Sequence, residues 1–290
     1  MKLDVLRSKY IPSWVLSFIK SSRTLYKRTN MFKETEINVF YREAEDETLA
    51  IRRVKKVLQF LRREFKELRS LSIKIVLILS HKKKFVVKRN DYDKPVIGAH
   101  EINSAVCIQN SIDEVDIIIY RIEDLPKVLI HEVIHFLKRD LLDVAHAVMP
   151  IEADIKREFP SVSHVNIMFN EAFTEAYAQY LYCMGGFTSI DKQRDRSLSN
   201  VKIFLNLNNC ETIEEFKGLQ DYDEDSHPFA YILLSSALLH SNKFISWIQN
   251  NGKTSSLRAI VKESFSPEWK DAISRRNSRY TRKFPFQLSA

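Results

Sequence analysis

The chain has 290 residues, enough for one large domain or two modest ones, and its apolar content of 44% is ordinary for a protein with a packed core. Three widely spaced cysteines, Cys107, Cys183 and Cys210, argue against a disulfide framework and against a cysteine-ligated zinc site, and they favour a reducing compartment, the cytoplasm. The five glycines are few and favour a helix-rich chain, whereas the net charge of +8 permits a nucleic-acid-binding protein.

Residues 1–41 are predicted to be an N-terminal docking segment. Its longest apolar run, residues 11–19, is interrupted by Pro12, Ser13 and Ser17 and is too short to span a bilayer. The segment also lacks a small-residue cleavage site, so a docking helix is expected rather than a signal peptide. No other stretch of the sequence approaches the length of a transmembrane helix.

Residues 42–70 are predicted to form a long amphipathic helix. Apolar residues recur at helical spacing between pairs of basic residues: Leu49, Ile51, Val54, Leu58, Leu61, Phe65 and Leu68. We expect this stripe to lie in the core and the charges to form a solvated face. A coiled-coil partner is the alternative, because the middle of the run keeps a heptad-like spacing.

The pattern changes from helical to β-rich after this helix. Residues 72–79 and 85–89 are predicted strands, and the basic residues 81–84 between them are typical of a hairpin tip. Residues 103–109 and 115–121 are predicted to continue the sheet. The last of these strands leads almost directly into the next predicted helix.

That helix carries the sequence HEVIH, in which two histidines have the spacing of metal ligands. His131 and His135 are four residues apart, so both can present a ring nitrogen to one ion, while Glu132 points beside it. Asp124 is a predicted N-cap, and Pro126 suits the first turn of the helix. The alternative interpretation is a pair of histidines buried in the core.

A third ligand decides which class of metal site this is. A metzincin site needs a histidine six residues after His135 and a glycine midway, but Leu141 and Lys138 occupy those positions. Farther along, the strongly helical sequence NEAFTE places Glu171 and Glu175 four residues apart on one face. By itself, this pattern is equally typical of a solvated helical face.

HEVIH followed by a second helix with NEAFTE resembles the gluzincin group of metallopeptidases, to which thermolysin and the minigluzincins belong. The resemblance implies one zinc ion per chain with Glu171 as the third ligand, and Glu175 as the carboxylate that orients a ligating histidine. It also implies that Glu132 is the general base that activates a water for attack on a peptide or protein substrate. The gap between His135 and Glu171 is longer than in thermolysin, which predicts an inserted short helix and loops.

The resemblance further implies an α+β fold with a zincin-like catalytic core, which we place at residues 42–186. In such a core the edge strand of a small mixed sheet borders the cleft, so residues 103–105 are expected on that strand, where free backbone groups can hold an extended peptide. The glycine pair 185–186 is the best candidate for a boundary. Residues 187–290 are then predicted to form a mainly helical C-terminal subdomain.

The C-terminal subdomain is predicted to contain helices at residues 213–219, 228–240 and 242–249, with an acidic loop at 221–225. Its tail combines positive charge with interleaved aromatic residues: Arg275, Arg276, Arg279, Tyr280, Arg282, Lys283 and Phe284. Such a cluster can contact nucleic acid or an acidic membrane surface. A basic nucleic-acid-binding protein is therefore the rival of the metallopeptidase.

A hydrogen-bond donor that stabilises the oxyanion is also expected beyond the glutamate helix. His227 is the favoured candidate, because it precedes an apolar helix opened by a proline and resembles in position the corresponding histidine of thermolysin-like enzymes. Asp223 or Asp225 is expected to orient its ring. The other candidates are Tyr222 and Tyr231. His146 and His164 are less favoured, because they precede the glutamate helix.

A catalytically inactive zincin scaffold or a structural zinc site is the remaining alternative. A structural site usually fills all four positions with cysteine or histidine and has no use for an acid that is not a ligand. Glu132 therefore argues against that alternative, and the sequence predicts an active zinc-dependent metallopeptidase.

Overall fold

The computed structural model describes residues 11–20, 26–80, 104–109, 114–122, 124–141, 145–220, 222–224, 227–250 and 252–276. The chain divides into two compact units, one of which ends at Leu137 while the other continues from Lys138. The first unit contains a five-stranded mixed sheet and the second is helical, which confirms the predicted α+β class. The division between the units differs from the expected boundaries at residues 41 and 186.

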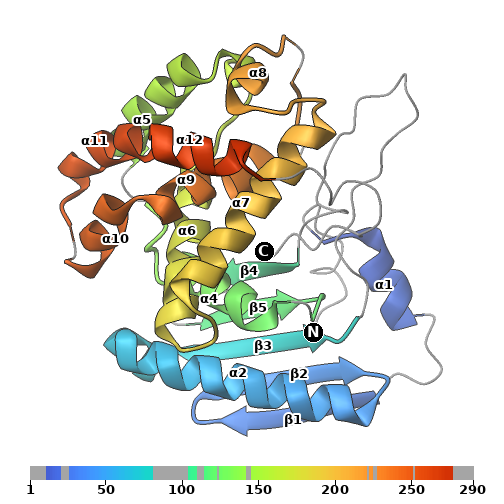
Figure 1. Ribbon diagram of the computed structural model, residues 1–290. Helices are drawn as coiled ribbons and strands as arrows, with labels where there is room; N and C mark the ends of the chain where they lie inside the picture. The colour runs from blue at the N-terminus through green and yellow to red at the C-terminus, as the bar shows by residue number, and fades with distance from the viewer. Residues whose placement is uncertain are drawn as a thin grey trace. The chain divides into compact units, whose positions relative to one another are not determined.

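The sheet of the first unit has the strand order β1-β2-β3-β5-β4 (Figure 1). Strands β2, β3 and β5 run parallel to one another, whereas β1 and β4 are antiparallel to their neighbours. This order places β4 at one edge of the sheet, as expected for the strand near residue 105. The strands are β1 (Tyr26–Phe32), β2 (Thr35–Tyr41), β3 (Ser72–Ile78), β4 (Ala105–Gln109) and β5 (Glu114–Ile119).

Strands β3, β4 and β5 confirm three of the predicted strands to within two residues at each end. The predicted strand 85–89 and the hairpin tip 81–84 lie outside the described residues, as does Asn103. Strands β1 and β2 belong to the segment that was expected only to dock, and the sequence did not predict them. The polar sequence of β1, most of which is exposed, has no alternation of apolar and polar residues that could have revealed it.

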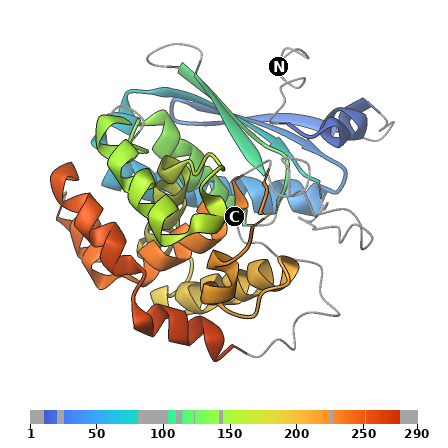
Figure 2. The same cartoon turned by 90° about the horizontal axis from the view of Figure 1, so that it is seen from above.

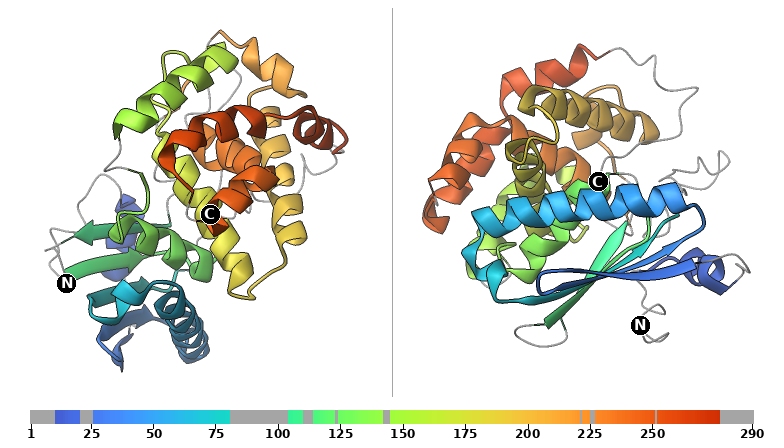
Figure 3. Two further views of the ribbon diagram at one scale, coloured as in Figure 1. Left: turned by 90° about the vertical axis from the view of Figure 1, so that its left-hand side faces the viewer. Right: turned by 90° about the horizontal axis from the view of Figure 1, so that it is seen from below.

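One face of the sheet is covered by α2 (Ala44–Glu64) and α4 (Leu125–Phe136), which also pack against each other. The right-hand view of Figure 3 shows α2 running across the strands. A 3-10 turn, Lys66–Arg69, follows α2, so the predicted helix 42–70 is confirmed over most of its length. Helix α4, which carries the two predicted histidine ligands, thus packs on the sheet beside α2.

The apolar stripe of α2 lies in the core of the chain itself. Val54, Leu58 and Leu61 are fully buried, as helical spacing along one face predicts. Leu49 is the exception, because its exposed fraction of 43% places it outside the buried stripe. Since the stripe already packs within the unit, it is not free for the coiled-coil partner that the sequence left as an alternative.

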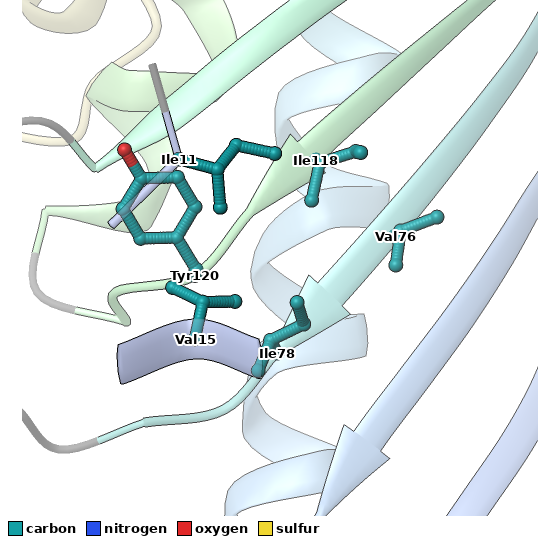
Figure 4. Close-up of a cluster of buried hydrophobic side chains, with 6 residues drawn as sticks. All are labelled: Ile11, Val15, Val76, Ile78, Ile118 and Tyr120. Carbon is teal, nitrogen blue, oxygen red and sulfur yellow. The ribbon is translucent and has the colours of Figure 1, made fainter. Parts of the chain in front are cut away.

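The opposite face of the sheet is covered by α1 (Ser13–Lys20), which confirms the predicted docking helix. Figure 4 shows the contact: Ile11 and Val15 pack on side chains of β3 and of the end of β5, while α2 lies behind the strands. Trp14 adds an edge-on contact with Tyr120, with the ring centroids 5.9 Å apart. The buried cluster consists of Ile11, Val15, Val76, Ile78, Ile118 and Tyr120.

The second unit is a helical assembly in which α6 has a central place, since it contacts α5, α7, α9 and the π-helical turn η5 (Figures 2 and 3). The predicted helices at 213–219, 228–240 and 242–249 are confirmed, the second of them as η5 followed by α9. The elements are α5 (Ala145–Glu158), η4 (Pro160–Val162), α6 (Phe169–Met184), α7 (Ile190–Leu207), α8 (Ile213–Lys217), η5 (Phe229–Leu234), α9 (Ser235–His240), α10 (Asn242–Gln249), α11 (Thr254–Ser264) and α12 (Pro267–Ser274).

The glycine pair lies between α6 and α7, inside the second unit. Gly185 caps α6, and Gly186 has a φ of +69°, a left-handed conformation that glycine adopts without steric cost. The glycine pair therefore marks the end of α6 and not a division between the two units.

Most of the predicted basic tail lies outside the described residues. Of its members, Arg275 and Arg276 are described, and they face Asp271 and Asp195 of the same unit. Within the described part of the chain, no helix combines the length and the apolar content that a membrane crossing requires.

Candidate metal centre

The two histidines lie on consecutive turns of α4, and their Nε2 atoms are 3.0 Å apart. Two nitrogens bound to one tetrahedral ion at about 2.05 Å each would be about 3.3 Å apart, so this pair is close to the geometry of a shared ligand set. His131 and Glu132 are each only 8% exposed, which shields them from bulk water. The spacing that the sequence predicted is therefore realised on a buried helix.

The start of α4 differs from the predicted N-cap in one respect. Asp124 does stand at the N-cap position, and Pro126 lies in the first turn. The aspartate has a φ of +53°, however, and its side chain makes no capping hydrogen bond to the helix. Its backbone carbonyl instead accepts hydrogen bonds from the N–H groups of Lys127 and Val128 at 2.9 and 3.0 Å.

Helix α6 positions Glu171 in its first turn. Oε2 of this carboxylate accepts a hydrogen bond from Tyr231 Oη at 2.9 Å, and Oε1 is 3.3 Å from Asn170 Nδ2. The helix N-terminus is itself held from the preceding helix, because Glu152 Oε1 accepts the N–H of Phe169 at 2.9 Å. Glu171 is thus fixed by partners on α6 and η5, and the sequence did not reveal Asn170 or Glu152 in these roles.

Glu175 lies one turn later on α6 and is 2% exposed. Its Oε1 accepts a hydrogen bond from Gln179 Nε2 at 2.8 Å. A glutamine amide that donates to one oxygen limits rotation of the carboxylate and leaves the other oxygen able to accept a second bond. Gln179 is a partner that sequence reasoning missed, although its i+4 spacing from Glu175 was visible.

His131, His135 and Glu171 form a group that can hold a metal ion, since one ligand atom from each lies within 4.8 Å of the others. The donor set of two imidazoles and one carboxylate fits a zinc ion that keeps an open coordination position. The three residues are the ones that the sequence predicted as ligands. The identity of the ion remains a prediction.

The candidates for an oxyanion donor occupy different places in the second unit. Tyr231 lies on η5 and touches Glu171, as described above. His227 instead directs Nδ1 at the carbonyl oxygen of Asn166, 3.1 Å away, and Tyr222 is buried and donates to Glu224 at 2.5 Å. Tyr231 is therefore the candidate with a direct contact to a predicted ligand, and the role given to His227 stays a prediction.

The two less favoured histidines lie before α6 in the second unit. His146 is exposed on α5, and His164 Nε2 is 2.6 Å from the carbonyl oxygen of Tyr222. Asp223, one of the two residues expected to orient His227, is exposed and accepts the N–H of Glu224 through its own carboxylate. Asp225 lies outside the described residues.

The carboxylate that faces His227 is Glu224, whose Oε1 is 4.0 Å from Nδ1 of the ring. Burial raises the pKa of Glu224 to about 7, although the hydrogen bonds from Tyr222 and from the N–H of Phe229 act in the opposite direction. The pKa of the Tyr222 hydroxyl is also raised, chiefly by burial and then by the negative charge of Glu224. Sequence reasoning missed Glu224 because its burial is not visible in an acidic loop.

No family model, no curated protein and no solved structure matches this chain.

Proposed function

We propose that the chain is a zinc-dependent metallopeptidase of the gluzincin type, with His131, His135 and Glu171 as the metal ligands. The observation that carries this proposal is the three-residue group itself, in which one ligand atom of each residue lies within 4.8 Å of the others. Three protein ligands are the number found in catalytic zinc sites, whereas structural sites use four. When bound, zinc supplies an acidified water and polarises the carbonyl of the substrate.

Glu132 is the proposed general base. It follows the first ligand on α4 and is 8% exposed, so little solvent competes for its carboxylate. In the proposed reaction it accepts a proton from the water that attacks the peptide carbonyl, and then delivers that proton to the amine nitrogen as the C–N bond breaks. The products are a carboxylic acid and an amine, and no covalent intermediate with the protein is needed.

Glu175 is proposed to orient one of the ligating histidines. A ligating imidazole usually donates its second N–H to a carboxylate, which fixes the tautomer and raises the basicity of the ligand. Gln179 supports this role, because its hydrogen bond at 2.8 Å holds the Glu175 side chain in one orientation. The substrate backbone is proposed to pair with β4, an edge strand in the described part of the sheet.

The first test is the metal content of the purified protein. We expect about one zinc per chain by elemental mass spectrometry, loss of peptide hydrolysis on chelation, and recovery on adding zinc back. The second test separates ligand from base: Glu132→Gln should bind zinc as the wild type does but lose hydrolysis, because only the proton acceptor is removed. Glu64→Gln on the exposed face of α2 is the matched control and should keep both properties.

Two outcomes would refute the proposal. A metal-free protein that hydrolyses peptides would remove the basis of the mechanism. Retained hydrolysis in Glu132→Gln, with normal zinc content, would show that another group accepts the proton. Hydrolysis of a different ester or amide class with an intact metal dependence would keep the site but change the substrate, because a fold does not fix a substrate.

A further inference from the structure

Two loops of the second unit are tied to each other by a reciprocal pair of histidines. His164 Nε2 is 2.6 Å from the carbonyl oxygen of Tyr222, and His227 Nδ1 is 3.1 Å from the carbonyl oxygen of Asn166. Since both partners are carbonyl oxygens, each ring nitrogen acts as the donor. The segment that precedes α6 is therefore joined to the segment that precedes η5 at two points.

Glu224 lies in the loop that is held by these two histidine hydrogen bonds. Its side chain is 1% exposed, and Oε2 accepts hydrogen bonds from Tyr222 Oη at 2.5 Å and from the N–H of Phe229 at 2.9 Å. Oε1 is buried, makes no hydrogen bond within the described part of the chain, and faces His227 Nδ1 at 4.0 Å. A buried carboxylate with two donors on one oxygen is a strong anchor for the backbone that it holds.

The anchored backbone leads directly to the candidate metal site. Phe229 is the first residue of η5 and Tyr231 is two residues later, while Glu171 is in the first turn of α6. π-helical turns are rare in proteins, and those that occur are frequently found at functional sites. His227, just before this turn, has a φ of +55°, a conformation that persists in a non-glycine residue only where its surroundings impose it.

We infer that Glu224 is a positioning residue: its carboxylate, with the ties from His164 and His227, fixes the start of η5 so that Tyr231 keeps its hydrogen bond with Glu171. Glu224 touches neither a predicted ligand nor a substrate, so it acts through Tyr231. This inference rests on the proposed function for its effect on metal binding and turnover. The anchoring itself is a property of the second unit alone.

The protonation state of Glu224 sets the strength of the anchor. The groups that face the carboxyl are the Tyr222 hydroxyl, the neighbouring Asp223 carboxylate and the His227 ring, with His164 bound to the Tyr222 carbonyl behind them. Burial raises the pKa of Glu224 to about 7. Above that pH the carboxylate accepts charge-assisted hydrogen bonds, which are roughly twice as strong as neutral ones, so the anchor is tighter in the ionised form.

The first experiment follows the anchor without any metal, by the NMR shift of the Phe229 amide proton between pH 5 and 9. In the wild type this shift should titrate with a midpoint near pH 7, and Glu224→Gln should abolish the titration. Asp191→Asn is the matched control, an exposed carboxylate in the first turn of α7 whose loss should leave the titration in place. Tyr222→Phe removes one donor to the ionised form and should move the midpoint upward.

The second experiment measures the consequence for the site. Cobalt affinity and the pH profile of kcat are compared for the wild type, Glu224→Gln and Asp191→Asn. We expect Glu224→Gln to weaken metal affinity by up to about tenfold, the low end of the cost of removing a supporting partner, and to lose an inflection of kcat near pH 7 that Asp191→Asn keeps.

The possible outcomes distinguish the proposed metallopeptidase function from the positioning role of Glu224. A Phe229 titration near pH 7 in a protein that binds no metal would refute the proposed function and keep the anchor. Metal binding and a pH profile that are unchanged in Glu224→Gln would overturn the inference and leave the proposed function standing. If Glu224→Gln does not fold, the predicted rise of the midpoint in Tyr222→Phe decides the question, and an unmoved midpoint overturns the inference.

Discussion

Replacing Glu224 by glutamine should make the protein more stable at alkaline pH, even though it removes a charged hydrogen-bond acceptor. The carboxyl has a pKa raised from the ordinary 4.5 to about 7, with burial as the largest cause. Because the folded state holds the proton more tightly than the unfolded state, this group contributes stability at low pH and loses that contribution as the pH rises through 7. A difference of about 2.5 in pKa corresponds to roughly 3 kcal/mol at 1.36 kcal/mol per pKa unit.

Glutamine has nearly the shape of the protonated acid and does not titrate in this range. Wild type and Glu224→Gln should therefore have similar unfolding free energies at pH 5, and the variant should be the more stable by up to roughly 3 kcal/mol at pH 8. Urea denaturation of both proteins at several pH values measures the difference, in which the titrations of all other groups cancel. A pH-independent difference between the two proteins would refute the reasoning, because it would show that Glu224 is already ionised at pH 5.

Three further predictions concern the metal site and the docking helix. Glu171→Ala should lose the metal, whereas Glu175→Ala should weaken metal affinity by about 10- to 100-fold; the reverse order in a zinc titration would exchange the two roles. Tyr231→Phe should lower kcat by roughly 100- to 1000-fold with the metal retained if it is the oxyanion donor, and the same loss in His227→Ala, with Tyr231→Phe active, would return the role to the histidine. Val15→Ala should lower the unfolding free energy by about 2 kcal/mol, since Val15 is fully buried between α1 and the sheet, and an unchanged urea midpoint would contradict that docking.

The parts of the fold that the sequence predicted are those in which local pattern and packing agree. The α2 stripe and strands β3 and β5 are strongly apolar and regular, so their periodicity revealed the type of each element and the approximate limits of the strands, whereas α2 ends at Glu64, before the predicted residue 70. The histidine pair was visible because a helix fixes the distance between residues four apart, whatever surrounds them. β1 was missed for the opposite reason: it is polar, mostly exposed, and held by pairing with β2, which its own sequence does not encode.

In the candidate site, too, the residues that the sequence did not predict are those whose role depends on tertiary contacts. The sequence named the acids on either side of Glu224, Asp223 and Asp225, as the partners of His227, because three acids in a row cannot be told apart by spacing. What distinguishes Glu224 is its burial and its two donors, which depend on how the loop folds back onto η5. The contact of Tyr231 with Glu171 likewise depends on a π-helical turn that periodicity does not predict.

The longer gap between the two ligand helices has a structural explanation that the expected short helix and loops did not include. The gap contains α5, a helix of 14 residues that contacts both α6 and α11. Two acids of α5 that are two residues apart, and so point in nearly opposite directions, each bind one of these neighbours. Glu152 accepts the N–H of Phe169 at the start of α6, and Asp154 accepts two hydrogen bonds from Arg258 of α11 at 2.6 and 2.9 Å. A carboxylate at a helix N-terminus also interacts favourably with the helix dipole, so Glu152 stabilises the turn that carries Glu171. The inserted helix α5 thus stabilises the first turn of α6, which carries the proposed third ligand, Glu171.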